Sequence, residues 1–253
     1  YPGFRPPQRR VVESVLAGRD TLAVLPTGGG KSICFQVPAL LRDGLTLVLS
    51  PLVSLMTDQV DALRRRGIPA AGLHGGLTAG EQADAIGRAV AGEVSLLYVA
   101  PERLVAGRAL TALGRAGVGL LAVDEAHCIS EWGHEFRPAY RGIAAIRAAL
   151  GGPQCVALTA TATSAVRDDI IRVCALRAPR VLVGGFDRPN LRFEVRRVAS
   201  RGRRDATLVD ALRTANGAAV AYAQSRARVE RIATALRREG VAAAAYHAGQ
   251  WSD

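Results

Sequence analysis

Short apolar runs alternate with longer amphipathic segments through most of the chain. The apolar runs at residues 21–25, 45–49, 95–99, 118–123 and 154–158 have the length and composition of buried strands. Between them, apolar positions recur with a helical period at residues 6–16, 33–41, 54–66, 78–90, 138–150 and 164–174. Continuous apolar strands that alternate with helices are typical of a parallel sheet covered on both faces, so the pattern predicts an α/β fold.

The alternation breaks around residues 184–190, a stretch with two glycines and a proline. We therefore predict a first domain over residues 1–184, a linker over 185–190 and an incomplete second α/β domain over 191–253. In that second domain the pattern predicts strands at 193–197, 218–223 and 242–246, with helices at 204–214 and 226–238.

An internal repeat supports the idea of a second, related domain. Residues 62–76 align without gaps to residues 235–249, with nine identical positions in fifteen. Each copy has the pattern of a helix end, a glycine, a short strand and then a histidine, which is His74 in one copy and His247 in the other. Part of the match comes from the alanine-rich composition, but the paired histidines and glycines do not.

Composition limits the class of protein without choosing a function. Apolar residues make up 49% and charged residues 22% of the chain, and no apolar run reaches the ~18 residues that a membrane span needs. The cysteines are far apart and form no CxxC pair (Cys34, Cys128, Cys155 and Cys174), which favours reduced thiols in a cytoplasmic protein over a zinc site or disulfides. A net charge of +11 indicates a polyanionic partner, either a nucleic acid or an acidic membrane surface.

A glycine-rich loop follows the first predicted strand and precedes a predicted helix. In this setting backbone N–H groups and a helix N-terminus can hold phosphates. The expected nucleotide-binding residues are Thr27, Gly28, Gly29, Gly30, Lys31 and Ser32, with Lys31 on the β- and γ-phosphates and the Ser32 hydroxyl on Mg²⁺. Lys31 is the only lysine among 33 basic residues, although the first glycine of the general P-loop pattern is replaced by Leu25. The alternative is a glycine-rich turn with no ligand.

Two carboxylates follow the predicted strand at 118–123. Asp124 would hold Mg²⁺ through water, and Glu125 would orient the attacking water. An Asp-Glu pair at the end of a strand is often only a solvated strand end, but its combination with the P-loop favours catalysis. His127 has two interpretations, as a catalytic residue or as a histidine that supports the carboxylates.

These motifs together resemble a known family. The P-loop, residues 124–127 (Asp-Glu-Ala-His) and residues 157–163 occur in the order found in superfamily 2 helicases, and residues 128–138 resemble the aromatic-rich loop of the RecQ family. Further matches lie at residues 1–8, 50–55, 98–104, 186–190, 221–226 and 246–249. The resemblance implies a RecA-like P-loop fold. It also implies use of ATP and Mg²⁺, single-stranded and partly duplex DNA as partners, and 3′–5′ unwinding in repair and recombination.

The resemblance also implies roles for individual residues. Tyr1 and Arg5 would sandwich the adenine, and Gln8 would read its edge. The DNA-binding and coupling residues would be Ser50, Pro51, Glu102, Arg103, Trp132, His134, Phe136, Arg137, Thr159, Thr161, Arg226 and His247. As alternatives, Tyr1 is terminal and could be disordered, and the aromatic residues Trp132 and Phe136 could be buried core residues.

The chain departs from the family pattern at three points. Pro7 replaces a glycine, and Glu131 replaces a glutamine, which brings a negative charge near the expected DNA. The later motifs of the second motor domain, including an arginine that completes the ATP site, have no match. We therefore expect weak ATPase activity without unwinding from these 253 residues. Two alternatives remain open: a non-catalytic, truncated paralogue that binds nucleotide and DNA, and a superfamily 2 RNA helicase.

Overall fold

The computed structural model describes all residues except 1–2, 105–106, 132–135, 186–189, 216 and 248–253. The chain divides into two compact units, residues 1–187 and 188–253. Residues 186–189 of the predicted linker at 185–190 lie outside the described residues. None of the helices that the structure describes combines the length and apolar character needed to cross a bilayer.

The first unit is built on a parallel seven-stranded sheet. Its strands are β1 (Thr21–Val24), β2 (Leu45–Leu49), β3 (Ala70–Leu73), β4 (Leu96–Val99), β5 (Val118–Val123), β6 (Gln154–Thr159) and β7 (Arg180–Val183). They are ordered β3-β4-β2-β5-β6-β1-β7, and every pair is parallel. Because β1 and β5 both neighbour β6, the loops after these three strands lie at the same edge of the sheet.

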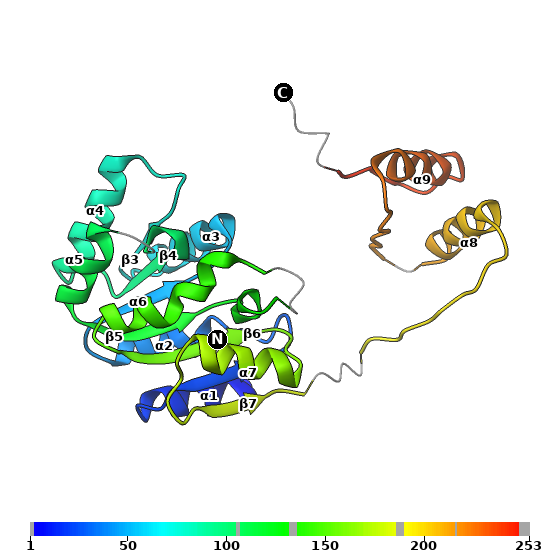
Figure 1. Ribbon diagram of the computed structural model, residues 1–253. Helices are drawn as coiled ribbons and strands as arrows, with labels where there is room; N and C mark the ends of the chain where they lie inside the picture. The colour runs from blue at the N-terminus through cyan, green and yellow to red at the C-terminus, as the bar shows by residue number, and fades with distance from the viewer. Residues whose placement is uncertain (1–2, 105–106, 132–135, 186–189, 216, 248–253) are drawn as a thin grey trace. The chain divides into compact units, whose positions relative to one another are not determined.

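Helices cover both faces of this sheet (Figure 1). The α-helices are α1 (Pro6–Leu16), α2 (Ile33–Leu41), α3 (Val53–Arg64), α4 (Ala79–Val90), α5 (Arg108–Ala116), α6 (Ile143–Ala149) and α7 (Ser164–Val173). Residues of α1 to α3 contribute to one buried core, and residues of α4 to α7 contribute to the other. Successive residues of the central strands alternate between the two, as Leu47 and Val48 do on β2. This alternation explains why the strands are apolar at every position.

The structure confirms the predicted α/β fold and refines several bounds. The predicted helix at 138–150 is a 3₁₀ helix (Pro138–Gly142) followed by α6, and two further 3₁₀ helices span Pro101–Arg103 and Ala126–Ile129. The hydrophobic pattern did not indicate α5 and β7. The edge strand β7 escaped because only Leu182 of its four residues is buried, so it lacks the continuous apolar pattern of the central strands.

The second unit contains two helices in its described part, α8 (Arg201–Arg213) and α9 (Arg226–Arg238), which agree with the predicted helices. The three strands predicted at 193–197, 218–223 and 242–246 are wrong, because the described residues of this unit form no strand. Strands need hydrogen-bonded neighbours, and two or fewer are marginally stable in water. The side chains that would pack inside a completed sheet are exposed instead, as Phe193 (90%), Tyr222 (94%) and Tyr246 (80%) illustrate.

Candidate functional site

The P-loop connects β1 to α2 at the carboxyl edge of the sheet. The Leu25 N–H donates to the carbonyl oxygen of Thr159 at 2.9 Å, which continues the pairing of β1 with β6 into the loop. Gly28 and Gly30 have φ angles of +75° and +69°, a left-handed conformation that favours glycine. A Cβ atom at Gly29 would lie 2.7 Å from the carbonyl oxygen of Pro26. Backbone geometry therefore requires the three successive glycines.

Two residues predicted to bind adenine contact this loop directly. The Gln8 side-chain amide donates to the carbonyl oxygens of Gly29 (3.0 Å) and Gly30 (3.2 Å), while its Oε1 accepts from the Arg5 backbone N–H at 2.8 Å. The Arg5 guanidinium donates to the carbonyl oxygen of Gly28. In this state the polar groups that would read a base hold the phosphate loop in place. Tyr1, the third predicted adenine contact, lies outside the described residues.

A cavity of about 460 Å³ opens beside Arg5 and Gln8. Phe4, Ile33 and Val37 supply its apolar lining, and none of the three was among the predicted site residues. Ile33 and Val37 are four residues apart on α2 and therefore lie on one face of it, a spacing that could have indicated them. The cavity combines apolar walls with a few polar groups, as sites for planar ligands do.

The loop after β5 brings Glu125 opposite the P-loop lysine. Lys31 Nζ lies 3.6 Å from Glu125 Oε1, and His127 Nδ1 lies 3.3 Å from Glu125 Oε2. The hydrogen bond from His127 and the charge of Lys31 outweigh the opposing effect of burial and lower the pKa of Glu125 below its ordinary value. Glu125 is therefore a carboxylate at neutral pH, able to orient a water molecule.

His127 also connects this loop to the one after β6. Its Nδ1 lies 3.0 Å from the Thr159 hydroxyl, which donates its own proton to the carbonyl oxygen of Thr161 at 3.0 Å. Because a hydroxyl has one proton, Thr159 accepts from His127. Contact with the Cys128 sulfur and with the Glu125 carboxylate raises the pKa of His127. A charged, hydrogen-bonded His127 thus links Glu125 to the two threonines.

Asp124 lies at the end of β5 and is only 3% exposed. Its carboxylate accepts from the Glu125 backbone N–H at 3.0 Å. Burial, and then the nearby Glu125 charge, raise the pKa of Asp124 from 3.8 to about 6. A buried carboxylate with a raised pKa is a group that a cation would stabilise.

The donor set fits Mg²⁺ held together with a nucleotide. Among the described residues, no three His, Cys, Asp or Glu side chains converge to form a metal site of their own. Mg²⁺ is commonly bound by one or two protein oxygens, with phosphates and water completing its shell. Asp124 and the Ser32 hydroxyl at the start of α2 provide such oxygens.

Replacing Asp124 with asparagine is expected to stabilise the ligand-free protein at pH 7.5 by about 2–3 kcal/mol, since ionising a group with a raised pKa opposes folding. The unmodified Asp124 becomes protonated in the folded state as the pH falls through about 6, so the advantage of Asn shrinks there. It should vanish only when the pH falls below 3.8, the ordinary pKa of the Asp carboxyl, where the unfolded chain is protonated too. Urea unfolding at several pH values measures this, with the exposed Asp43→Asn as the matched control. An Asn variant that is no more stable at pH 7.5 would contradict the prediction.

The predicted DNA-binding residues occupy different environments. Ser50 and Pro51 are buried just after β2, and the Ser50 hydroxyl has no hydrogen-bond partner among the described residues. Glu102 and Arg103 are exposed after β4, and Phe136 and Arg137 are half-buried. Trp132 and His134 lie outside the described residues.

Two of the predicted DNA-binding residues, Arg226 and His247, belong to the second unit. Arg226 is exposed at the start of α9, and His247 Nε2 lies 2.8 Å from Glu230 Oε1. The structure therefore brings together the P-loop, residues 124–127 and Thr159 with Thr161.

Comparison with known proteins identifies a family and individual proteins that this chain resembles. Residues 5–169 match the family described as DEAD/DEAH box helicase. The chain is 43% identical over 249 residues to the ATP-dependent DNA helicase RecQ of Pasteurella multocida and 40% identical over 255 residues to that of Bacillus subtilis. These matches cover 98% and 100% of this chain but only 39% and 43% of the relatives.

Solved structures share the fold at low sequence identity. A hypothetical ATP-dependent RNA helicase from Sulfolobus tokodaii is similar with a TM-score of 0.60 and 20% identity, covering 93% of this chain and 68% of that one. The DUF1998 helicase MrfA is similar with a TM-score of 0.69 and 16% identity, covering 94% of this chain and 39% of that one. These similarities concern the arrangement of the sheet and its helices.

Proposed function

The chain belongs to the DEAD/DEAH box helicase family, and from this premise we propose that it is the ATP-hydrolysing region of a RecQ-type DNA helicase. The observation that carries the proposal is the convergence of Lys31, Glu125 and His127 at the carboxyl edge of the sheet. We extend the proposal to 3′–5′ translocation on single-stranded DNA and unwinding of partly duplex DNA in repair and recombination. We also propose a cytoplasmic location.

Each residue has a physical role in this proposal. The P-loop backbone and Lys31 bind the phosphates, and Arg5 and Gln8 orient the adenine within the adjacent cavity. Glu125, held by His127, positions the attacking water. Asp124 and Ser32 would hold Mg²⁺, which when bound neutralises charge on the phosphates. The His127–Thr159–Thr161 connection provides a path by which DNA contact could reach Glu125.

The DNA-binding side of the proposal rests on exposed and charged groups. A net charge of +11 favours a polyanion, and exposed arginines such as Arg103 and Arg226 can contact backbone phosphates. Phe136 and Trp132 would stack on bases without regard to sequence. The domain bounds 1–184 and 191–253 stay predictions, and within the second unit Arg226 and His247 are the residues proposed to bind DNA.

The experiment that tests the proposal measures phosphate release from ATP by this chain with no nucleic acid, with single-stranded DNA and with single-stranded RNA. We expect slow hydrolysis that DNA accelerates more than RNA does, and no activity in Lys31→Ala. Removal of Lys31 leaves the phosphates without their contacting ammonium.

Other outcomes separate the alternatives. Stimulation by RNA alone would favour an RNA helicase. Nucleotide binding that Lys31→Ala abolishes, without any turnover, would favour a binding module. Hydrolysis that Lys31→Ala leaves unchanged would contradict the proposed site.

A further inference from the structure

Arg141 lies beside the segment that carries Phe136, and the proposed function assigns it no role. Its guanidinium carbon is 5.0 Å from the centroid of the Phe136 ring, the geometry of a cation–π contact. The same guanidinium forms an ion pair with Glu131. One side chain thus touches both a predicted base-stacking residue and the acidic residue that departs from the family pattern.

The Glu131–Arg141 pair is easily broken. The Arg141 and Glu131 side chains are 61% and 62% exposed, and water and salt screen such pairs strongly. A phosphate makes charge-assisted, often bidentate hydrogen bonds with a guanidinium, which suits Arg141 better than an exposed carboxylate does. A DNA backbone brought close to this position can therefore compete with Glu131.

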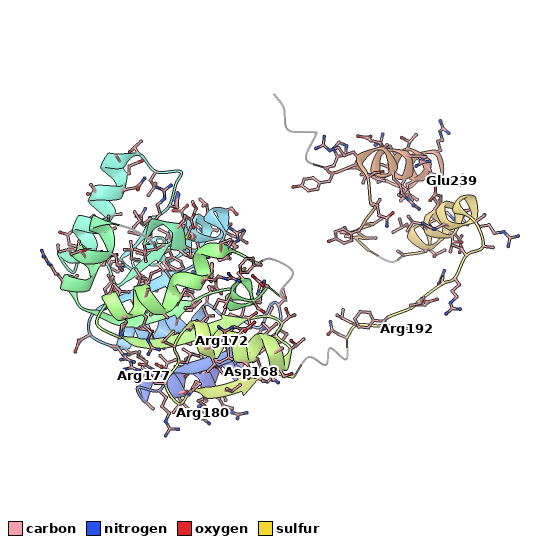
Figure 2. The ribbon with its side chains drawn as sticks, in the orientation of Figure 1. Asp168, Arg172, Arg177, Arg180, Arg192 and Glu239 are labelled. Carbon is pink, nitrogen blue, oxygen red and sulfur yellow. The ribbon has the colours of Figure 1, made fainter. Side chains whose placement is uncertain are left out.

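A neighbouring pair provides a contrast within the same cavity of about 450 Å³, which Glu131, Arg141, Asp169 and Arg172 all line. Asp169 accepts from the Ser130 hydroxyl at 2.7 Å and from Arg172 at 2.6 Å, and these two hydrogen bonds lower the pKa of Asp169. Arg172, labelled in Figure 2, comes from α7. Asp169 thus accepts hydrogen bonds from both Ser130 and Arg172, and Arg172 makes no cation–π contact within the described part of the chain. Arg141, in contrast, lies against the Phe136 ring.

We propose that Arg141 contacts DNA and positions Phe136: on binding, its guanidinium exchanges Glu131 for a backbone phosphate of the strand whose base stacks on Phe136. This inference rests on the proposed function. A ring has two faces, and the guanidinium covers one of them, so it fixes the ring for a base on the other. When DNA is absent, the ion pair with Glu131 keeps Arg141 in position.

The test measures binding of a fluorescein-labelled oligothymidylate by anisotropy at several NaCl concentrations. Arg141→Gln should weaken binding about 5–10-fold and reduce the slope of log K against log salt by ~0.7, the loss of one phosphate contact on a single strand. Glu131→Gln should tighten binding about 2–3-fold, since Arg141 no longer has to leave a partner. Arg172→Gln is the matched control and should leave the affinity within about 2-fold.

The double variant Glu131→Gln/Arg141→Gln distinguishes exchange of the Arg141 partner from simple repulsion between the Glu131 carboxylate and DNA. If Arg141 exchanges partners, Glu131→Gln should tighten binding less in the Arg141→Gln background than in the unaltered chain. Equal tightening in both backgrounds, or an unchanged salt slope in Arg141→Gln, would overturn the inference while leaving the proposed function standing. Failure of the unaltered chain to bind single-stranded DNA would overturn both. Circular dichroism spectra of each variant establish that all are folded.

Discussion

Replacing Arg147 with methionine is expected to lower the free energy of unfolding by about 3–5 kcal/mol, the cost of leaving a buried charge without its partner. The side chains of Arg147 on α6 and Asp20, just before β1, are each 4% exposed. Arg147 Nη2 donates to both carboxylate oxygens of Asp20, at 2.9 and 2.8 Å. Arg147 also donates to the carbonyl oxygens of Pro153, at 2.8 Å, and Ala175, at 2.6 Å.

Asp20 extends this network to two further segments. It accepts from the backbone N–H groups of Cys155 (2.8 Å) and Arg177 (2.6 Å). Removing the arginine therefore leaves a buried carboxylate that still holds β6 and the segment before β7. Urea unfolding followed by far-UV circular dichroism measures the loss.

The matched control for this prediction is Arg177→Gln. The Arg177 side chain, labelled in Figure 2, also lies near Asp20, with Nε at 3.9 Å, but it is 67% exposed. We expect this control to cost only ~0–1 kcal/mol, as for exposed pairs. Equal losses in the two variants would show that burial of the Asp20–Arg147 pair is not what matters.

The second large effect is expected from Glu125→Gln, which should reduce the turnover of ATP by about 10²–10⁴-fold. Glutamine keeps the shape of the side chain but cannot act as a carboxylate base. Nucleotide affinity should change little, because the phosphates are held by the P-loop backbone and Lys31. Phosphate release and binding of a fluorescent ATP analogue measure the two quantities separately.

Glu93→Gln gives the matched control for that substitution. Glu93 is exposed between α4 and β4, where it pairs with Arg88 at 3.6 Å, and three strands (β2, β5 and β6) separate β4 from β1, the strand that precedes the P-loop. The Glu93→Gln variant should hydrolyse ATP at the rate of the unaltered chain. If Glu125→Gln retained full turnover, a different group would have to position the attacking water.

The central sheet and the phosphate loop were predictable for the same reason. β2, β4, β5 and β6 are buried on both faces, so their sequences are apolar at nearly every position and stand out from the helices. The P-loop follows β1, which is likewise buried at every position, and Asp124–Glu125 follows β5, so their spacing from the strand ends fixes where they lie. The local sequence pattern was therefore sufficient to predict the central strands and the loops that follow them.

Contacts between distant residues were not predictable in this way. Asp20 and Arg147 are 127 positions apart, and nothing near either residue marks it as part of a buried pair. The hydrogen bonds from Gln8 to the P-loop carbonyls span 21 and 22 positions and depend on how α1 packs beside the loop. The strands predicted in the second unit failed for the opposite reason: their local pattern is correct, but a strand also requires a neighbour that the described residues do not provide.

The solitary lysine has a practical consequence for chemical labelling. Lys31 is the only primary amine on a side chain in these 253 residues, and its side chain is 13% exposed beside Glu125. An amine-selective reagent can therefore modify only Lys31 and the α-amino group. Its rate of reaction at Lys31 directly reports how accessible the P-loop is. Acylation at that position would block the phosphate site without altering any other side chain, so the fraction of the Lys31 peptide that carries the acyl group measures the fraction of inactivated molecules.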